Sequence, residues 1–247
     1  MEVMWNLWHG CKRISPGCKN CYVFRSDARR NLDANNFYIT KSFELPLQRK
    51  KDGQYKYPSG TLFWTCFSSD FFLEVADSYR EKAWSIIKER SDCHFFFITK
   101  RILRFWQCIP DDWENGYENV TIGVTCETQK LVDERLIFFN KLPVHYKAII
   151  LEPLLESVDL SHYLKNGYRA VVAGGESGEG ARIADFEWFK ALQKQCLEAK
   201  VTFIFKQTGL NFIKDGKIYR IPRPHQHRQA RKAGLNVHFN DYWKTGK

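Results

Sequence analysis

From residue 60 onward, short apolar runs alternate with amphipathic segments of helical length, and this alternation restricts the fold more than any other feature of the sequence. Six of the runs predict β-strands, at 61–67, 93–99, 119–126, 146–154, 168–175 and 201–209. Each run is apolar throughout, which is typical of strands covered on both faces, as in parallel sheets. Helices are expected between the strands, over 73–90, 128–142 and 185–200 and, more briefly, near 101–109 and from about Ser161. Such βαβ repeats wind into a barrel or an open, doubly wound sheet, so the sequence predicts the α/β class.

The chain reads as one domain over residues 1–247, because no low-complexity segment or linker divides it and α/β barrels of this length are common. Residues 31–60 are more polar and predict a basic insertion, either a loop or a small hairpin. Residues 210–247 predict a segment that closes the domain, beginning with a hairpin around Asp215-Gly216.

The chain carries 38 Lys and Arg against 28 Asp and Glu, a formal net charge of +10. Such an excess favours an anionic partner, and nucleic acid is the first expectation. If exposed, Trp5 and Trp8 could stack on bases, although tryptophan is more often part of a core. The opening residues lack the basic and apolar regions of a signal peptide, and no run approaches the roughly 18 apolar residues of a membrane span. We therefore expect a cytoplasmic protein with no membrane partner, whose 8 cysteines stay reduced.

Polar or charged residues follow every predicted strand at its C-terminal end, where the βα loops of parallel α/β folds converge and sites are built. A charge attached to an apolar run, such as Glu152 or Lys206, needs a partner at the barrel mouth, which could be a ligand or a structural ion pair. The Gly-Gly pair in "AGGESGEGAR" would let the backbone approach a ligand and offer N–H groups to an anion. The candidate site residues are Ser68, Ser69, Asp70, Lys100, Arg101, Glu127, Glu152, Gly174, Gly175, Glu176, Lys206 and Gln207.

Three cysteines, Cys11, Cys18 and Cys21, lie within eleven residues near the N-terminus. A structural zinc site needs four ligands, and His9 could complete a Cys3His set. Three thiolates alone would instead hold a four-iron cluster with one iron open to a substrate or cofactor. The ligand count and the barrel-like context favour the open cluster. The remaining cysteines are single residues among apolar neighbours and predict small buried side chains: Cys66, Cys93, Cys108, Cys126 and Cys196.

A family resemblance adds to this interpretation. The segments that carry it are "WNLWHGCKRISPGCKNCY", "SSDFF", "FFFITKR", "VTIGVTCETQKLVDERL", "IILEPLLESVDL", "VVAGGESGEGARIADFEW" and "FIFKQTG". Together, over about residues 5–235, the chain resembles a phage- and bacteria-encoded, radical-SAM-like three-Cys-motif family of unknown function. The chain departs from the usual radical S-adenosylmethionine (SAM) pattern in three ways. Its cysteines are separated by six and two residues instead of three and two. An aromatic residue, Tyr22, follows the third cysteine instead of preceding it, and the Gly-Gly-Glu follows a late strand instead of the second.

The resemblance implies a partial or near-closed TIM-like (β/α) barrel of about six parallel strands, with the three cysteines on an N-terminal loop. It implies an enzyme in which Cys11, Cys18 and Cys21 hold a 4Fe–4S cluster and SAM yields a 5′-deoxyadenosyl radical that abstracts hydrogen from a substrate. We expect modification or repair of DNA or tRNA, an electron donor such as flavodoxin or ferredoxin, and a possible three-Cys-motif partner protein. SAM contacts are expected from Ser68, Ser69, Asp70, Glu127, Glu152, Gly174, Gly175 and Glu176. Substrate contacts are expected from Lys100, Arg101, Lys206 and Gln207.

Two alternatives remain open from the sequence. The first is a zinc-stabilised nucleic-acid-binding protein without redox chemistry. The second is a metal-dependent nuclease that uses Asp70, Glu127 and Glu152 around a divalent ion.

Overall fold

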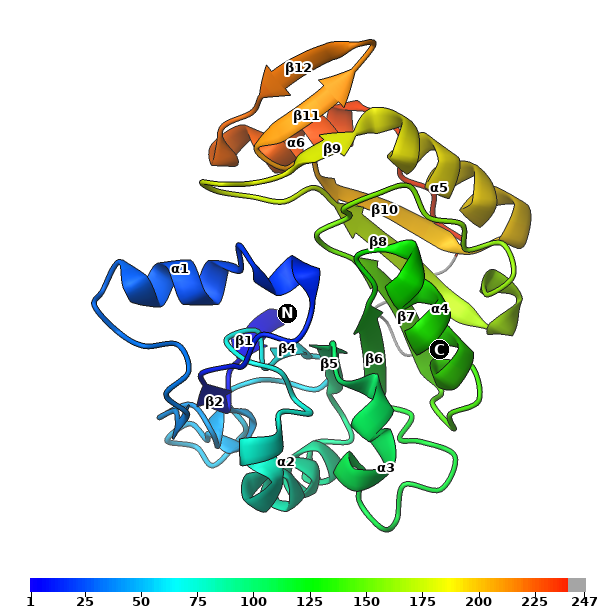
Figure 1. Ribbon diagram of the computed structural model, residues 1–247. Coiled ribbons are helices and arrows are strands. Elements are labelled where there is room, and N and C mark those ends of the chain that lie inside the picture. Colours follow the sequence, from blue (N-terminus) through cyan, green and yellow to red (C-terminus); the bar gives the residue numbers. More distant parts are fainter. Residues whose placement is uncertain (240–247) are drawn as a thin grey trace.

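A curled sheet of seven parallel strands forms the centre of the molecule in the computed structural model, which describes residues 1–239. Its spatial order is β1-β4-β5-β6-β7-β8-β10, and every neighbouring pair is parallel. The sheet curves through about half a barrel and stays open between its two edge strands (Figure 1). The strands are β1 (Glu2–Trp5), β4 (Leu62–Thr65), β5 (His94–Thr99), β6 (Val120–Thr125), β7 (Tyr146–Leu151), β8 (Tyr168–Gly174) and β10 (Thr202–Gln207). The predicted partial α/β barrel is confirmed.

All six strands predicted from the apolar runs are present, and the structure adds a seventh, β1, at one edge of the sheet. Along β1, Glu2 and Met4 are exposed, Val3 is half-buried and Trp5 is buried. An edge strand with one open face does not produce a continuous apolar run. The pattern that revealed the other strands therefore could not reveal this one.

Helices cover the convex face of the sheet (Figure 1). The longer ones are α2 (Asp77–Glu89), α4 (Gln129–Phe139) and α5 (Phe186–Ala199), and the four-residue α3 (Phe105–Cys108) follows a 3-10 turn. Side-chain oxygens cap two of them, since Thr128 accepts the N–H of Leu131 and Asp185 accepts the N–H of Glu187. The helix expected from Ser161 is only a 3-10 turn, η5 (Leu164–Asn166), followed by Gly167 in the left-handed region.

Both faces of the sheet are packed, which accounts for the continuous apolar runs. The main core fills the space between the sheet and the helices. A smaller core lies apart from it and consists of Leu62, Phe96, Ala148, Ile150 and Val172. Trp5 and Trp8 are fully buried in the main core, so neither can stack on a base.

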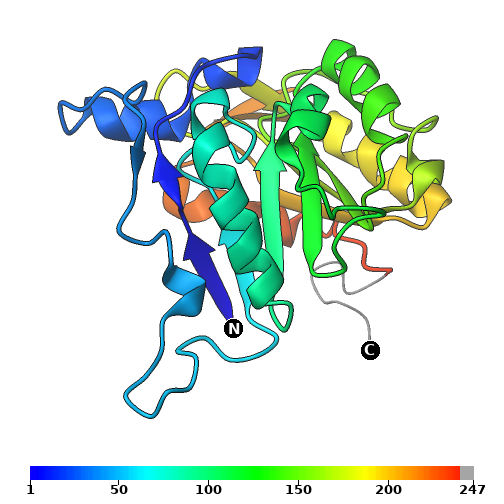
Figure 2. The ribbon, with the colours of Figure 1, turned by 90° about the horizontal axis from the view of Figure 1, so that it is seen from below.

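The N-terminal segment runs from β1 to the carboxyl ends of the strands. There it forms β2 (Trp8–His9), the 3-10 turn η1 (Pro16–Cys18) and α1 (Tyr22–Ala28). In Figure 2 the strand arrows point toward the end of the molecule where this blue segment lies. The polar insertion follows, with β3 (Tyr38–Ile39) paired to β2, the turn η2 (Leu45–Leu47) and a small hairpin closed by an Arg49–Tyr55 bridge.

A second, three-stranded sheet contains β9 (Ile183–Asp185), β11 (Asn211–Lys214) and β12 (Lys217–Arg220). The predicted hairpin around Asp215-Gly216 joins β11 and β12 antiparallel, with both turn residues at positive φ. Helix α6 (Arg223–Lys232) then packs against β10. Residues 240–247 of the predicted closing segment lie outside the described residues. In the part of the chain described, no helix has both the length and the apolar character to cross a membrane.

Candidate functional site

A cavity of about 460 Å³ lies at the carboxyl ends of the strands, and all three clustered cysteines line it. Its volume falls within the roughly 300–1,000 Å³ of small-molecule sites. The structure brings to it most of the candidate residues, namely Ser69, Asp70, Lys100, Arg101, Glu152, Gly175, Glu176, Lys206 and Gln207. Ser68, Glu127 and Gly174 do not line this cavity.

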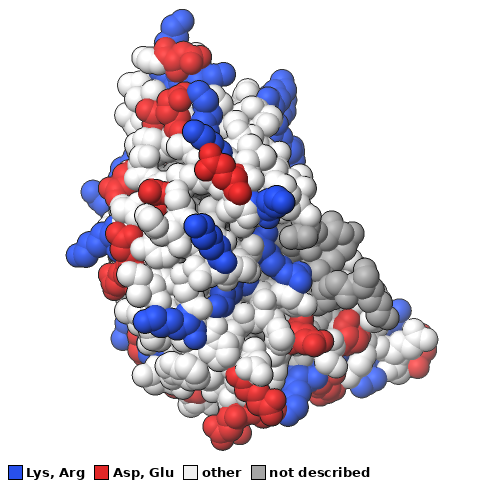
Figure 3. Space-filling model, turned by 90° about the vertical axis from the view of Figure 1, so that its right-hand side faces the viewer, with Lys and Arg blue, Asp and Glu red and all other residues white. Residues whose placement is uncertain are grey.

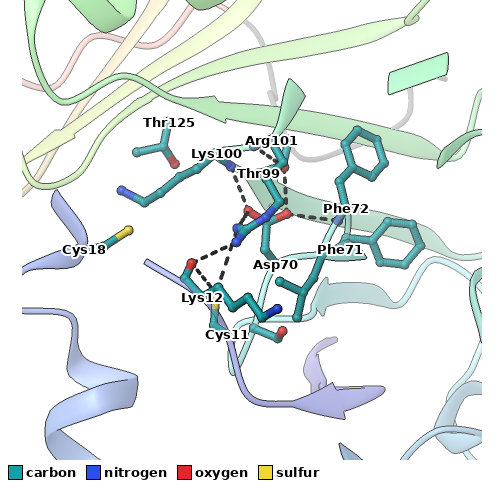
Figure 4. Close-up of polar contacts among 12 residues, drawn as sticks. Cys11, Lys12, Cys18, Asp70, Phe71, Phe72, Thr99, Lys100, Arg101 and Thr125 are labelled. Atoms are coloured by element: carbon teal, nitrogen blue, oxygen red, sulfur yellow. Dashed lines mark hydrogen bonds and ion pairs between the residues drawn. The ribbon is translucent and has the colours of Figure 1, made fainter. Parts of the chain in front are cut away.

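Asp70 connects the ends of β4 and β5. Its carboxylate accepts hydrogen bonds from the Thr99 hydroxyl at 2.7 Å and from the backbone N–H groups of Phe72 and Lys100, each at 2.9 Å. Arg101 Nη1 lies 3.2 Å from the carboxylate oxygen Oδ2 of Asp70 (Figure 4). These four donors satisfy the buried carboxylate, so the contacts of Asp70 are structural, and its role in SAM binding stays a prediction.

Arg101 fixes the loop that carries the cysteines. Its guanidinium donates to the carbonyl oxygen of Lys12 at 2.8 Å and approaches Cys11 Sγ at 4.0 Å (Figure 4). It also pairs with Asp70 and, at 3.4 Å, with Glu74. A buried arginine with two carboxylates has its charge balanced, and it is poorly placed to receive an anionic substrate.

Glu127 is fully buried beneath the same loop. One carboxylate oxygen accepts from Lys100 Nζ and from the Ser15 hydroxyl, and the other lies 3.2 Å from Arg135 Nη1. A methyl group added to Gly17 would lie 2.7 Å from Glu127 Cγ, so the loop can sit this close only because Gly17 has no side chain. Glu127 therefore anchors the cysteine loop from below.

Glu176 holds the loop from the other side. It accepts two bonds from the Arg182 guanidinium and one, at 2.9 Å, from Asn20 Nδ2, between the second and third cysteines. Arg182 also donates to the carbonyl oxygen of Pro16 at 3.1 Å. These bonds hold the pKa of Glu176 below its ordinary value, although burial opposes them. They connect the loop after β8 directly to the cysteine loop.

The Gly174-Gly175 pair is packed against protein. The N–H of Gly175 donates to the carbonyl oxygen of Gln207 at 3.0 Å, and the carbonyl oxygen of Gly174 accepts from Leu154 at 2.8 Å. A methyl group on Gly175 would lie 2.8 Å from the carbonyl carbon of Thr208. The glycines therefore allow two strand ends to approach each other, and the N–H of Gly175 is not free to hold an anion.

The remaining candidates also make protein contacts. The Ser68 hydroxyl donates to the carbonyl oxygen of Trp8 at 2.8 Å, and the Ser69 hydroxyl donates to that of Gly10, so both hold the N-terminal segment. Lys206 Nζ lies 2.9 Å from Glu152 Oε2, and this pair lines the cavity. Gln207 Nε2 donates to the carbonyl oxygen of Gly175 at 3.1 Å.

The three thiols come from different parts of one loop. Cys11 lies in a stretch without regular secondary structure, Cys18 ends η1, and Cys21 is the residue before α1. Burial, reinforced by the Asp70 carboxylate, raises the pKa of Cys11 to about 12. Burial acts in the same direction on Cys18, but Lys100 and hydrogen bonds from the loop outweigh it, so the pKa of Cys18 lies below its ordinary value.

Within residues 1–239, no group of three or more His, Cys, Asp or Glu side chains is close enough to hold a single metal ion. His9, the fourth ligand of a possible zinc site, has its Nε2 2.6 Å from the buried carboxylate of Asp27 and does not line the cavity. The three nuclease candidates Asp70, Glu127 and Glu152 each have a cationic partner. The geometry therefore favours neither alternative.

Several functional residues escaped the sequence reasoning. Ser15 and Asn20 lie between the cysteines, and Arg135 and Arg182 come from a helix and a late loop. None of these four follows a strand, so the strand-end pattern carries no signal for them. The cavity wall also includes Arg25, Arg223 and His227, which lie in basic segments that favoured a nucleic-acid partner from the sequence. The five single cysteines are all buried, as predicted, although Cys66 also lines the cavity.

Comparison with known proteins gives the family of the chain but no characterised relative. No curated protein and no solved structure matches it significantly. A family model described as a protein of unknown function, DUF5131, matches residues 1–241, which is nearly the whole chain. The chain therefore belongs to the DUF5131 family.

Proposed function

We propose that this chain is a radical-SAM-like iron–sulfur enzyme, in which Cys11, Cys18 and Cys21 hold a 4Fe–4S cluster beside a SAM site and the substrate is a nucleic acid. One observation carries the proposal. The three thiols line a single cavity at the carboxyl ends of a parallel half-barrel, where α/β enzymes build their sites.

The donor set supports a cluster better than a single ion. A zinc ion would need four donors about 2.0–2.3 Å from one point. In a 4Fe–4S cluster each cysteine binds a different iron, so the sulfur atoms surround a larger body. All three thiols line one cavity of about 460 Å³, which has room for the larger body.

Several buried side chains hold the cysteine loop in place. Asp70, through Arg101, fixes the segment at Cys11 and Lys12. Glu127 fixes Ser15, and Glu176 fixes Asn20, so each stretch between the cysteines has its own attachment to the barrel. Such a preorganised loop is what a cofactor site requires.

Charge near the thiols supports the same function. Lys100 lowers the pKa of Cys18, whereas Arg101 opposes only in part the effect of burial on the pKa of Cys11. Thiolates are the ligand form, so two cations beside the loop favour cluster binding. A bound cluster would supply the electron that cleaves the sulfonium of SAM, while the protein would position the reacting groups and exclude water.

The test is anaerobic purification followed by reconstitution with iron and sulfide. We expect a brown protein with about four iron and four sulfide per chain. With dithionite and SAM, it should release 5′-deoxyadenosine, measured by chromatography and mass spectrometry. Cys18→Ala should lose both iron and product. Cys196→Ala, which removes a buried thiol outside the cavity, should retain both.

Two results would contradict the proposal. One is a colourless protein that holds one zinc per chain after anaerobic preparation. The other is magnesium-dependent cutting of DNA that survives replacement of all three clustered cysteines by alanine.

A further inference from the structure

The cavity has two kinds of cationic lining. Lys100 and Arg101 follow β5, Lys206 lies near the end of β10, and each is paired with a carboxylate. Arg25 on α1 and Arg223 on α6 also line the cavity, and they come from the two helices beside the open side of the sheet (Figure 1). This second set differs from the first in its ion pairing.

Within the described residues, neither Arg25 nor Arg223 forms an ion pair. Arg25 donates from Nη1 to the carbonyl oxygen of Glu179 at 3.4 Å, and Arg223 makes no polar contact with residues 1–239. Arg223 is exposed and Arg25 is half-buried. His227 lies one helical turn after Arg223 and lines the same wall. Its Nδ1 forms a 2.8 Å hydrogen bond with the carbonyl oxygen of Lys206. Within residues 1–239, no carboxylate therefore compensates the charge of Arg25 or Arg223, and a ligand can pair with both.

The surroundings of these arginines indicate the class of ligand. Residues 217–239, which include β12 and α6, contain no Asp or Glu, whereas the face in Figure 3 mixes basic and acidic side chains. A guanidinium binds phosphate with two parallel hydrogen bonds. Aromatic side chains that can stack on a base line the cavity as well: Tyr22, Phe24 and Phe67.

We infer that Arg25 and Arg223 bind a backbone phosphate of single-stranded nucleic acid, while the attached base enters the cavity toward the cysteine loop. A base within a duplex cannot reach a recessed site, and enzymes that act on bases take a single strand or an extruded nucleotide. The inference rests on the proposed function for what happens to the base, but the binding contacts themselves involve no cysteine.

The test is fluorescence anisotropy with a labelled twelve-residue oligodeoxythymidylate at 100 mM salt, compared with a duplex of the same length. Arg25→Ala and Arg223→Ala should each weaken binding about tenfold, since a hydrogen bond to a charged group contributes about 1.5 kcal/mol or more. Each should also reduce the slope of log affinity against log salt by about one. The matched controls are Arg29→Ala, just beyond α1, and Arg228→Ala on α6, both exposed and outside the cavity, and they should change affinity less than twofold.

Equal losses for the cavity variants and their controls would overturn the site, as would a failure of the intact protein to bind the oligonucleotide. If the duplex binds as tightly as the single strand, the inference that a base enters the cavity is wrong. Both cavity arginines lack buried partners, so unchanged melting curves should show that the variants are folded. The unaltered protein prepared without iron should bind the oligonucleotide normally, which separates a failure of this site from a failure of the cluster.

Discussion

Replacing Glu127 with glutamine tests whether the cysteine loop is held from below by a buried ion pair. The side chain is fully buried and faces Lys100 and Arg135, whose side chains are 20% and 5% exposed. Glutamine has nearly the same shape and can still accept from the Ser15 hydroxyl, but it carries no charge. The substitution therefore isolates the loss of the counter-ion.

The expected cost follows from the burial of the two cations. Breaking a buried ion pair by removing one partner costs about 3–5 kcal/mol, because the remaining charge is left uncompensated. Lys100 is partly exposed and can turn toward water, so we expect the lower end, about 3 kcal/mol. In a chain of this size, 1 kcal/mol corresponds to roughly 2–4 °C in Tm, which gives a decrease of about 6–12 °C.

The assay is urea denaturation and thermal melting of the cluster-free protein, followed by far-UV circular dichroism. Glu134→Gln is the matched control, because Glu134 is exposed on α4, the helix that also carries Arg135. It should change the free energy of unfolding by less than about 0.5 kcal/mol. If Glu127→Gln is as stable as the control, the anchoring role is wrong, and Glu127 is available for a ligand as the sequence first suggested.

Two further predictions concern stability. Gly17→Ala should lower the free energy of unfolding by about 1–3 kcal/mol, because the new methyl group would overlap Glu127, and an unchanged urea midpoint would contradict this. Burial, with a contribution from nearby Arg169, lowers the pKa of His94 to about 4, whereas the unfolded value is about 6.5. The unfolded chain therefore binds this proton first as the pH falls, and from pH 7 to pH 5 the contribution of His94 should decrease the stability by about 2 kcal/mol. Urea titrations at both pH values should show that His94→Asn lacks this pH-dependent loss of stability, whereas the exposed control His162→Asn retains it.

The strands could be predicted because their environment leaves a simple mark on the sequence. A strand packed on both faces must be apolar throughout, and "HFFFIT" in β5 shows this directly. Strand β1 has one exposed face, which carries Glu2 and Met4. Its sequence is therefore not continuously apolar, and the strand could not be predicted from an apolar run. The hairpin at Asp215-Gly216 was also readable, because positive φ at both turn residues favours this pair.

The site was predictable in position but not in pairing. Parallel strands must bring their C-terminal residues together, so the sequence indicated that Lys100, Glu127, Glu152 and Lys206 would gather there. It could not indicate that Lys100 would pair with Glu127 and Lys206 with Glu152, residues separated by 27 and 54 positions. Those pairs depend on the curvature of the sheet and on where the cysteine loop docks, which no local pattern encodes.

The ion pairs divide the charged groups of the cavity into two sets with different roles. Carboxylates and cations at the strand ends neutralise one another and hold the cysteine loop, so they add little net attraction for a polyanion. The unpaired cations come from α1 and α6, beside the side of the barrel that stays open between β1 and β10 (Figure 1). A closed eight-stranded barrel would admit a ligand only through its mouth. In this chain the sheet stays open between β1 and β10, and Arg25 and Arg223 line the cavity from the helices beside that side. This arrangement suits the single-stranded substrate inferred above.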